Sequence, residues 1–246
     1  MSKLQGKVAV VTGASKGIGA SIAKAFGEQG ASVVVNYASD KEGADRVVQS
    51  ITSAGGKAFA VKGSVAEDAE TIVNAAVENF GKLDILVNNA GVYEFAPLEE
   101  VTPEHFFRQY NTNVLGLLLV TKAGAKYLPE GGSVINVGSL ATRSLPTATS
   151  VYTGTKAAVD AITGVLSKEL GPRKIRVNAL NPGFVLTEGT QTSGIADSDF
   201  VSQIVAQTPL GRAGQPQDIA SAAVFLASED SAWITGEQIN AGGGVR

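Results

Sequence analysis

Residues 7–19 read KVAVVTGASKGIG, an apolar run followed directly by a turn with three glycines and then by a helical pattern. Short, valine-rich apolar runs are typical of strands that are buried on both faces. Gly13, Gly17 and Gly19 allow the backbone to turn sharply and to come close to a bound group, while the N–H groups at the start of the helix favour an anion. The spacing G-x-x-x-G-x-G therefore predicts a strand–turn–helix unit that binds a pyrophosphate.

The same alternation of apolar runs and amphipathic segments continues along the chain. The apolar runs lie at 7–12, 32–37, 58–63, 84–89, 133–138, 175–180 and 237–242. The segments of helical period between them include 17–29, 40–54, 66–80, 103–128, 150–170 and 216–227. Repeated strand–helix alternation predicts an α/β fold in which a parallel sheet is wound with helices on both faces. Ligands of such sheets bind at the carboxyl ends of the strands.

The composition indicates one large domain and excludes several classes of function. The 246 residues are 44% hydrophobic and carry a net charge of −3, so no basic excess is present to neutralise phosphates and we expect no nucleic-acid partner. The absence of cysteine and the single histidine, His105, exclude zinc sites built from several such ligands, and we expect no metal. The chain shows neither a long apolar span nor a secretory pattern, so we expect a cytoplasmic protein with no membrane partner.

Polar residues follow two of the later apolar runs. Asn88-Asn89-Ala90-Gly91 comes directly after DILV, and Ser139 comes directly after SVINVG. Tyr152 and Lys156 lie one turn apart on the helix predicted for 150–170, so the ammonium can approach the phenol. A nearby cation favours the phenolate and lowers the tyrosine pKa, which makes Tyr152 a proton donor and acceptor near neutrality. Each pattern alone is also typical of ordinary structural residues.

Residues 13–17 also match G-x-S-x-G, the turn that holds the nucleophile of α/β-hydrolases, with Ser15 at its centre. This alternative requires His105 as the base and an acidic partner between Ser15 and His105 in the sequence. No HGGG-type segment that would supply oxyanion donors precedes Ser15. A hydrolase is therefore the less favoured hypothesis.

In combination and in this order, the motifs closely resemble those of the short-chain dehydrogenase/reductase family. The matching positions extend over nearly the whole chain: 12–19, 88–91, Ser139, Tyr152, Lys156, 180–183, 209–212, 234–236 and 242–244. The resemblance implies a single doubly wound Rossmann domain over residues 1–246 with a seven-stranded parallel sheet. It also implies a homotetramer, in which the helices at 103–128 and from Ser150 form one interface and the C-terminal strand and tail form another.

The resemblance assigns hydride transfer between a nicotinamide coenzyme and a carbonyl or secondary alcohol to a catalytic set of four residues. Ser139 and Tyr152 would hydrogen-bond the carbonyl oxygen, Lys156 would lower the Tyr152 pKa and bind ribose hydroxyls, and Asn113 would hold a water that links the lysine to solvent. Asn113 is chosen over Asn111 because it directly precedes Val-x-Gly. A non-catalytic coenzyme-binding protein is the alternative from another class, but it would have no need of a proton donor.

The coenzyme is expected to be NADP(H) in preference to NAD(H). NAD-specific folds place a carboxylate after the second strand, whereas this chain has Asn36 there, with Ser39, Lys41 and Lys16 as further donors for a 2′-phosphate. Ser64-Val65 departs from the Asp-Val that the family commonly places beside adenine. The coenzyme contacts implied are Gly13, Ser15, Lys16, Gly17, Ile18, Gly19, Asn36, Tyr37, Ala38, Ser39, Ser64, Val65, Asn89, Ala90, Gly91, Tyr152, Lys156, Pro182, Gly183, Val185 and Thr187.

The expected substrate is a small ketone or keto-ester, because the residues predicted to line the pocket are mostly apolar. They are Ser139, Leu140, Ala141, Tyr93, Glu94, Leu145 and Phe184, with a substrate lid at about 187–207. A 3-oxoacyl-carrier-protein reductase of fatty-acid synthesis is an alternative: Arg173 matches one basic docking position, but Glu130 occupies another. A glucose or polyol 1-dehydrogenase is the remaining alternative.

Overall fold

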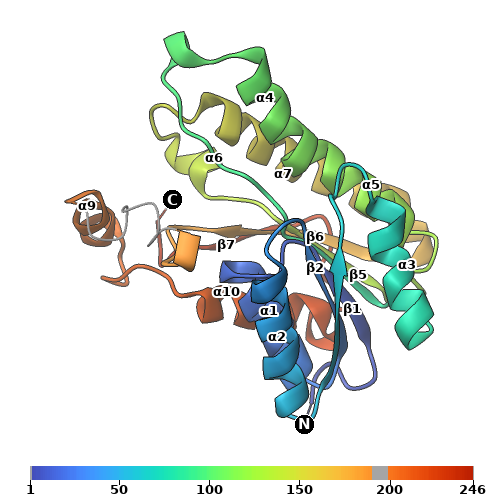
Figure 1. Cartoon of the computed structure of the whole chain (residues 1–246). Helices are drawn as coiled ribbons and strands as arrows, with labels where there is room; N and C mark the ends of the chain where they lie inside the picture. The colour runs from blue at the N-terminus through green and yellow to red at the C-terminus, as the bar shows by residue number, and fades with distance from the viewer. Residues whose placement is uncertain (1, 190–198, 246) are drawn as a thin grey trace.

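The computed structural model describes residues 2–189 and 199–245 and contains a seven-stranded, all-parallel sheet. The strand order is β3-β2-β1-β4-β5-β6-β7, which confirms the predicted doubly wound α/β fold (Figure 1). The strands are β1 (Val8–Val11), β2 (Ser32–Tyr37), β3 (Lys57–Lys62), β4 (Ile85–Asn88), β5 (Ser133–Val137), β6 (Arg176–Pro182) and β7 (Gln238–Ala241).

Two hydrophobic cores lie on opposite faces of this sheet because successive side chains of a strand point to opposite sides. In β1, Ala9 and Val11 belong to one core, while Val8 and Val10 belong to the other. Val10 is in register with Val34 of β2 and with a leucine of β4, so the second core continues across the centre of the sheet. All four β1 side chains are buried, as the valine-rich run predicts.

Helices cover both faces. The first core lies under α1 (Gly17–Glu28), α2 (Lys41–Ser53) and α10 (Pro216–Ala227), and the second under α3 (Ala69–Phe80), α5 (Leu117–Gly124) and α7 (Ser150–Leu170) (Figure 1). The bounds of α7 and α10 agree with the predicted ranges to the residue. Each helix crosses from one strand to the next parallel strand, so the turns that follow the strands gather at one edge of the sheet.

The segment 103–128, predicted as one regular helix, is divided in the structure. The structure has α4 (Pro103–Tyr110), then a π-helical segment η2 (Asn111–Gly116), and then α5, which ends at Gly124. Sequence periodicity did not reveal the break because α4, η2 and α5 follow one another without an intervening loop. A π segment widens the helix locally and is frequent at functional sites, and this one carries Asn113.

Several short elements were not predicted. They are η1 (Leu98–Glu100), α6 (Ala141–Ser144), η3 (Gly171–Arg173) and η4 (Glu229–Ser231). Of the lid expected at 187–207, residues 190–198 lie outside the described residues, and the final part forms helix α9 (Asp199–Gln207). Among the described residues, no helix has the length and apolar character needed to cross a membrane.

Candidate active site

The turn between β1 and α1 lies directly against the turn after β4. Gly13 has a φ of +60°, and a Cβ there would come within 2.8 Å of the Ala90 Cα, so the approach requires glycine. The Thr12 hydroxyl accepts hydrogen bonds from the N–H groups of Asn89 and Ala90, both at 3.0 Å. The Asn89 amide donates to the carbonyl oxygens of Thr12 and Gly13 at 2.9 and 3.0 Å. Thr12 and Asn89 thus join the two turns, a role of Thr12 that the sequence analysis missed.

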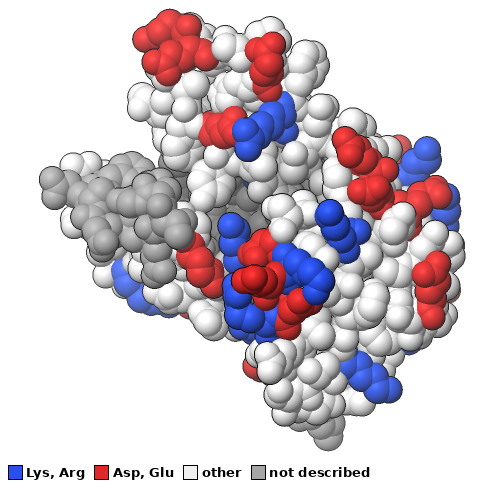
Figure 2. Space-filling view, in the orientation of Figure 1, with Lys and Arg blue, Asp and Glu red and all other residues white. Residues whose placement is uncertain are grey.

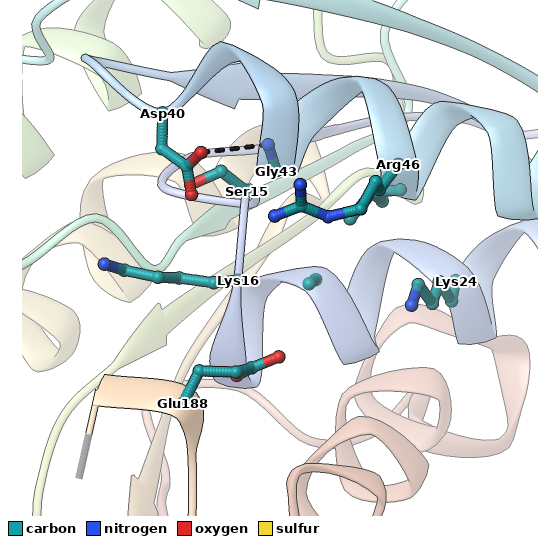
Figure 3. A pocket seen from close by; sticks show the side chains of 9 residues that line it. Ser15, Lys16, Lys24, Asp40, Gly43, Arg46 and Glu188 are labelled. Atoms are coloured by element: carbon teal, nitrogen blue, oxygen red, sulfur yellow. Dashed lines mark hydrogen bonds between the residues drawn. The ribbon is translucent and has the colours of Figure 1, made fainter. Parts of the chain in front are cut away.

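The start of α1 is arranged to receive an anion. The N–H of Gly17 donates a 3.0 Å hydrogen bond to the Glu188 carboxylate, which reaches it from the segment after β6. A cavity of about 200 Å³ beside this contact lies between α1 and α2, and its lining includes Lys16, Lys24 and Arg46 (Figure 3). Acidic and basic side chains gather together over these helices (Figure 2). Glu188, Lys24 and Arg46 were not singled out from the sequence.

These features fit the dinucleotide that the glycine turn predicts. The turn has the close backbone approach that a pyrophosphate needs, and the first N–H of α1 already binds a carboxylate, which is also an anion. Thr187 lies beside Gly17, so the segment after β6 meets the same turn. Ala38 and Ser39 are exposed at the end of β2, where the adenosine end would lie.

The side chain of Asn36 does not make the predicted approach to a 2′-phosphate. Its side chain is 1% exposed, its Oδ1 accepts a hydrogen bond from the N–H of Gly13 at 3.2 Å, and its amide donates to the Gly63 carbonyl at 3.0 Å. The amide therefore ties the glycine turn to the end of β3 and is not directed at a 2′-phosphate. The other predicted donors for that phosphate, Lys16, Ser39 and Lys41, are exposed, and their contacts stay predictions.

The other predicted coenzyme contacts lie at strand ends, in agreement with the parallel sheet. Tyr37 and Val65 are buried, Ser64 donates its N–H to the Asp68 carboxylate, and Val185 bridges to Gly214. Their contacts with a coenzyme stay predictions, as do those of Ser15, Ile18, Gly19, Gly91, Pro182 and Gly183.

The catalytic set predicted from the sequence converges from three elements. Tyr152 and Lys156 lie on α7, and Ser139, which follows β5, makes a hydrogen bond with Tyr152. The Lys156 ammonium donates to the Val137 carbonyl at 2.8 Å and lies 5.9 Å from the centre of the Tyr152 ring. This arrangement places a phenol and a serine hydroxyl side by side, where they can meet one carbonyl oxygen.

Asn113 fastens the loop after β4 to α7. Its Oδ1 accepts from the N–H of Val92 at 2.8 Å, and its amide donates to the Val92 carbonyl at 2.9 Å and to the Thr155 hydroxyl at 3.0 Å. The Thr155 hydroxyl in turn donates to the Tyr152 carbonyl at 2.7 Å. Asn113 therefore supports the Tyr152 turn of α7, and its role in holding a water stays a prediction.

Burial dominates the electrostatics of the site. It raises the pKa of the Tyr152 phenol above its usual value, and the Ser139 hydrogen bond offsets part of that rise. It lowers the pKa of the Lys156 ammonium from 10.5 to about 8, against the opposing charge of Asp160. Lys156 is not among the groups that shift the Tyr152 pKa here, so its role in lowering that pKa stays a prediction.

Aromatic rings lie beside Tyr152. Phe95 packs edge-on against Tyr152 with 6.4 Å between ring centres, and Tyr93 lies 6.1 Å from Phe95. Phe95 is 56% exposed and was missed by the sequence analysis. Glu94 pairs with Arg108 at 2.9 Å, which turns the carboxylate toward α4.

Leu140 was predicted to line the substrate pocket, but it is buried in the protein. It is 3% exposed and packs against Gly183 and Gly242, so it supports the ends of β6 and β7 instead of facing a substrate. Ala141 is partly buried, and Leu145 is exposed with a φ of +47° at the end of α6. Contacts of Ala141, Leu145 and Phe184 with a substrate stay predictions.

The hydrolase alternative requires a hydrogen bond between His105 and Ser15, and the structure does not contain it. The Nε2 of His105 lies 2.8 Å from the Gln109 amide nitrogen and 3.3 Å from the Glu94 carbonyl oxygen, while its Nδ1 has no hydrogen-bond partner. His105 therefore makes no hydrogen bond to Ser15. The backbone N–H of His105 donates a 3.2 Å hydrogen bond to the hydroxyl of Thr102, the N-cap of α4. Among the residues that the structure describes, no cluster of His, Cys, Asp and Glu suitable for a metal ion is found.

A family described as enoyl-(acyl carrier protein) reductase matches residues 13–246. An uncharacterized oxidoreductase of Methylorubrum extorquens is 62% identical over 100% of both chains. A trihydroxynaphthalene reductase of Pestalotiopsis fici is 37% identical over 98% of this chain and 90% of its own. The crystal structure of a short chain dehydrogenase from Burkholderia cenocepacia in complex with NADP is 35% identical, covers 98% of each chain and has a TM-score of 0.92.

Proposed function

The chain belongs to the short-chain dehydrogenase/reductase family, and on that premise we propose that this oxidoreductase uses NADPH to reduce a small ketone or keto-ester to the hydroxy compound. The observation that carries the proposal is the convergence of Ser139, Tyr152 and Lys156 beside a turn that fits a dinucleotide. We further propose that it works as a cytoplasmic homotetramer. The exposed apolar side chains on α4, η2, α5 and α7 support that assembly: Phe107, Leu115, Leu118 and Val165.

Reduction needs a proton donor at the carbonyl oxygen. When bound, the reduced nicotinamide supplies hydride to the carbonyl carbon. The Ser139 and Tyr152 hydroxyls hydrogen-bond the carbonyl oxygen and stabilise the negative charge that develops there, and the Tyr152 Oη–H then transfers its proton to that oxygen. Because burial raises its pKa, Tyr152 holds this proton at neutral pH and is ready to act as the acid. Lys156 supplies positive charge beside the ring, and its ammonium would bind the ribose hydroxyls of the coenzyme.

NADP(H) is proposed over NAD(H) on the basis of charge. Lys16 is exposed at the glycine turn, Ser39 is exposed after β2, and the 35%-identical Burkholderia structure contains NADP. A charge-assisted hydrogen bond to phosphate contributes about 1.5–3 kcal/mol. Lys16→Glu should therefore weaken NADPH binding by about ten-fold or more and leave NADH binding nearly unchanged.

The aromatic border favours a substrate with an aromatic or other broad apolar part. Tyr93 and Phe95 form a continuous ring surface up to Tyr152, and one relative is named for a naphthalene substrate. A carrier-protein substrate receives less support, because the Arg173 guanidinium is already bound to the carbonyl oxygens of Ala125 and Leu128 at 2.7 and 2.9 Å. We therefore rank a bicyclic aromatic ketone first among small ketones.

The test is steady-state NADPH oxidation with a bicyclic aromatic ketone, an aliphatic keto-ester, a carrier-linked 3-oxoacyl thioester and glucose. Phe95→Ala should raise the KM for the aromatic ketone by about 2–10-fold, the range expected for one aromatic contact. Phe59→Ala on β3, which also removes a partly exposed ring, should leave it unchanged. Failure to reduce any carbonyl compound with either coenzyme would overturn the proposed function. Faster turnover of the carrier-linked thioester would show that the substrate is carrier-linked and not a small ketone.

A further inference from the structure

Helix α7 carries a further polar side chain in line with Tyr152 and Lys156. Asp160 lies one turn after Lys156 and is 9% exposed. Residues four apart on a helix lie on the same face, so Tyr152, Lys156 and Asp160 form one stripe along α7. Aspartate is rarely buried unless its charge is balanced by hydrogen bonds or a cation. None of the steps of hydride and proton transfer described above uses this carboxylate.

The carboxylate of Asp160 contacts two other segments of the site. Its Oδ1 accepts a 3.0 Å hydrogen bond from the Asn181 amide, which lies near the end of β6. Its Oδ2 lies 3.3 Å from the Thr142 hydroxyl, which is also 3.0 Å from the Ser139 carbonyl oxygen. Because a hydroxyl has one hydrogen, Thr142 shares it between the two acceptors. Asp160 therefore links α7 both to the Ser139 turn and to the end of β6.

The packing around Asn181 shows that this contact is closely fitted. Asn181 is fully buried, and a Cβ on Gly138, the residue before Ser139, would overlap its amide oxygen. That amide oxygen has no hydrogen-bond partner. A buried acceptor without a partner destabilises the fold, so space filling alone does not account for an asparagine here. The Asn181 amide is oriented by the hydrogen bond that its N–H group donates to Asp160.

Asp160 also acts on Lys156 through its charge. The groups around the ammonium are the Tyr152 ring on the same helix, the Val137 carbonyl on β5 and the loop at Gly91. Tyr93 interacts with Tyr152, and Arg143 of α6 is turned toward Gln238. Asp160 is the negative charge that opposes the effect of burial on Lys156.

We propose that Asp160 is a positioning residue of the reductase site, which holds the Ser139 turn and the end of β6 in place against the Tyr152–Lys156 face of α7. The proposal rests on the proposed function, because it assigns a role in that reaction. Asp160 does not touch the reacting atoms. It acts through Thr142 on the Ser139 turn, through Asn181 on the segment that leads into Pro182 and Gly183, and by its charge on the Lys156 ammonium.

The charge is tested with Asp160→Asn, which keeps the size of the side chain. Loss of the carboxylate should lower the Lys156 pKa further, so the alkaline decline of kcat/KM for ketone reduction should move to lower pH by about one unit. Asp84→Asn is the matched control. Asp84 is also buried, and its carboxylate accepts the N–H of Val8 at 2.8 Å and pairs with Lys82 at the opposite edge of the sheet. The control should lose stability without moving the pH profile.

The geometry is tested with Thr142→Val, which keeps the shape of the side chain and the charge of Asp160. This variant should lower kcat by about 3–10-fold, the effect of one lost hydrogen bond, with an unchanged pH profile and unchanged NADPH affinity by nicotinamide fluorescence. An unshifted profile in folded Asp160→Asn, or an equal shift in Asp84→Asn, would refute the role of the charge. Wild-type kcat in Thr142→Val would refute the positioning role even if Asp160→Asn does not fold.

These outcomes are separable from failure of the proposed function. If the wild-type protein reduces no carbonyl compound, the proposed function fails, and with it the premise of the role assigned to Asp160. If the wild type is active and both variants behave like it, the proposed function stands and the role of Asp160 is wrong. Unfolding midpoints of all the proteins, measured in parallel, show whether a loss of kcat comes from loss of folded protein.

Discussion

Replacing Lys156 by methionine should abolish turnover and yet stabilise the fold. Lys156 is 6% exposed, and its ammonium is held by the 2.8 Å hydrogen bond to Val137. Burial lowers its pKa from 10.5 to about 8, although Asp160 opposes the change. A pKa change of this size means that the ammonium form costs the folded protein about 3 kcal/mol relative to the unfolded chain. Methionine has a similar length and carries no charge.

The expected gain is smaller than this penalty. Methionine leaves the Val137 carbonyl without its donor, which costs about 1 kcal/mol, so the variant should be more stable by about 2 kcal/mol at pH 7. The gain depends on pH. Between about pH 8 and 10.5 the unfolded wild-type chain binds a proton that folded Lys156 has released, so wild-type stability rises with pH across this window. The advantage of the variant is therefore complete below pH 8 and disappears as pH approaches 10.5.

Urea unfolding followed by far-UV circular dichroism at pH 7 and at pH 10, at a fixed protein concentration, measures both values. Lys168→Met is the control, because Lys168 lies on the same helix and is exposed. It should change the free energy of unfolding by less than about 0.5 kcal/mol at either pH. A Lys156→Met variant that is less stable than wild type at pH 7, or an advantage equal at both pH values, would refute the assignment of a buried, destabilising ammonium.

Three further predictions concern the proton donor, the coenzyme turn and the assembly. Tyr152→Phe should reduce the rate of ketone reduction by about 10²–10⁴-fold, the usual contribution of a general acid, and leave NADPH binding largely intact in a fluorescence titration; substantial residual turnover would contradict the assignment. Glu188→Gln removes the carboxylate that binds the N–H of Gly17, so NADPH affinity should rise by about 2–5-fold, the effect of one anion at a helix start; weaker binding would show that Glu188 supports the coenzyme instead. Leu118→Glu places a charge on the apolar surface of α5 and should convert the proposed tetramer to smaller species in size-exclusion chromatography with light scattering. A wild-type protein that is monomeric would contradict the proposed assembly.

Elements of the fold could be predicted where burial leaves a repeating pattern in the sequence. The residues of β1 are all buried, and this gives the continuous apolar run at 8–11. The bounds of α7 follow from its helical period between Ser150 and Leu170. The π segment at Asn111–Gly116 was missed because the chain remains helical on both sides of it. Asn113 within it is hydrogen-bonded to Val92, which lies 21 residues earlier in the sequence, and periodicity does not reveal such a contact.

The partners of polar residues could not be predicted in the same way. Asn36 occupies a position that suggests a coenzyme contact, but its amide is used by Gly13 and Gly63, which reach it from two other turns. Asp160 and Asn181 meet because of the way α7 packs against β6. Neither residue breaks the helical or strand pattern of the segment in which it lies. A polar residue in a buried segment thus predicts a hydrogen bond, while its partner depends on how elements distant in sequence pack together.

The pKa of Tyr152 shows the same limit and has a consequence for the chemistry. Spacing on a helix correctly brought Lys156 near Tyr152, and from proximity alone a lower tyrosine pKa follows. Burial acts on both groups, however: it raises the Tyr152 pKa and lowers that of Lys156 to about 8, so each is shifted toward its neutral form. A neutral phenol is the form that donates a proton to a ketone, whereas alcohol oxidation needs the phenolate. The raised Tyr152 pKa therefore suits the proposed reduction, and the charge of Asp160 opposes the effect of burial on the neighbouring ammonium.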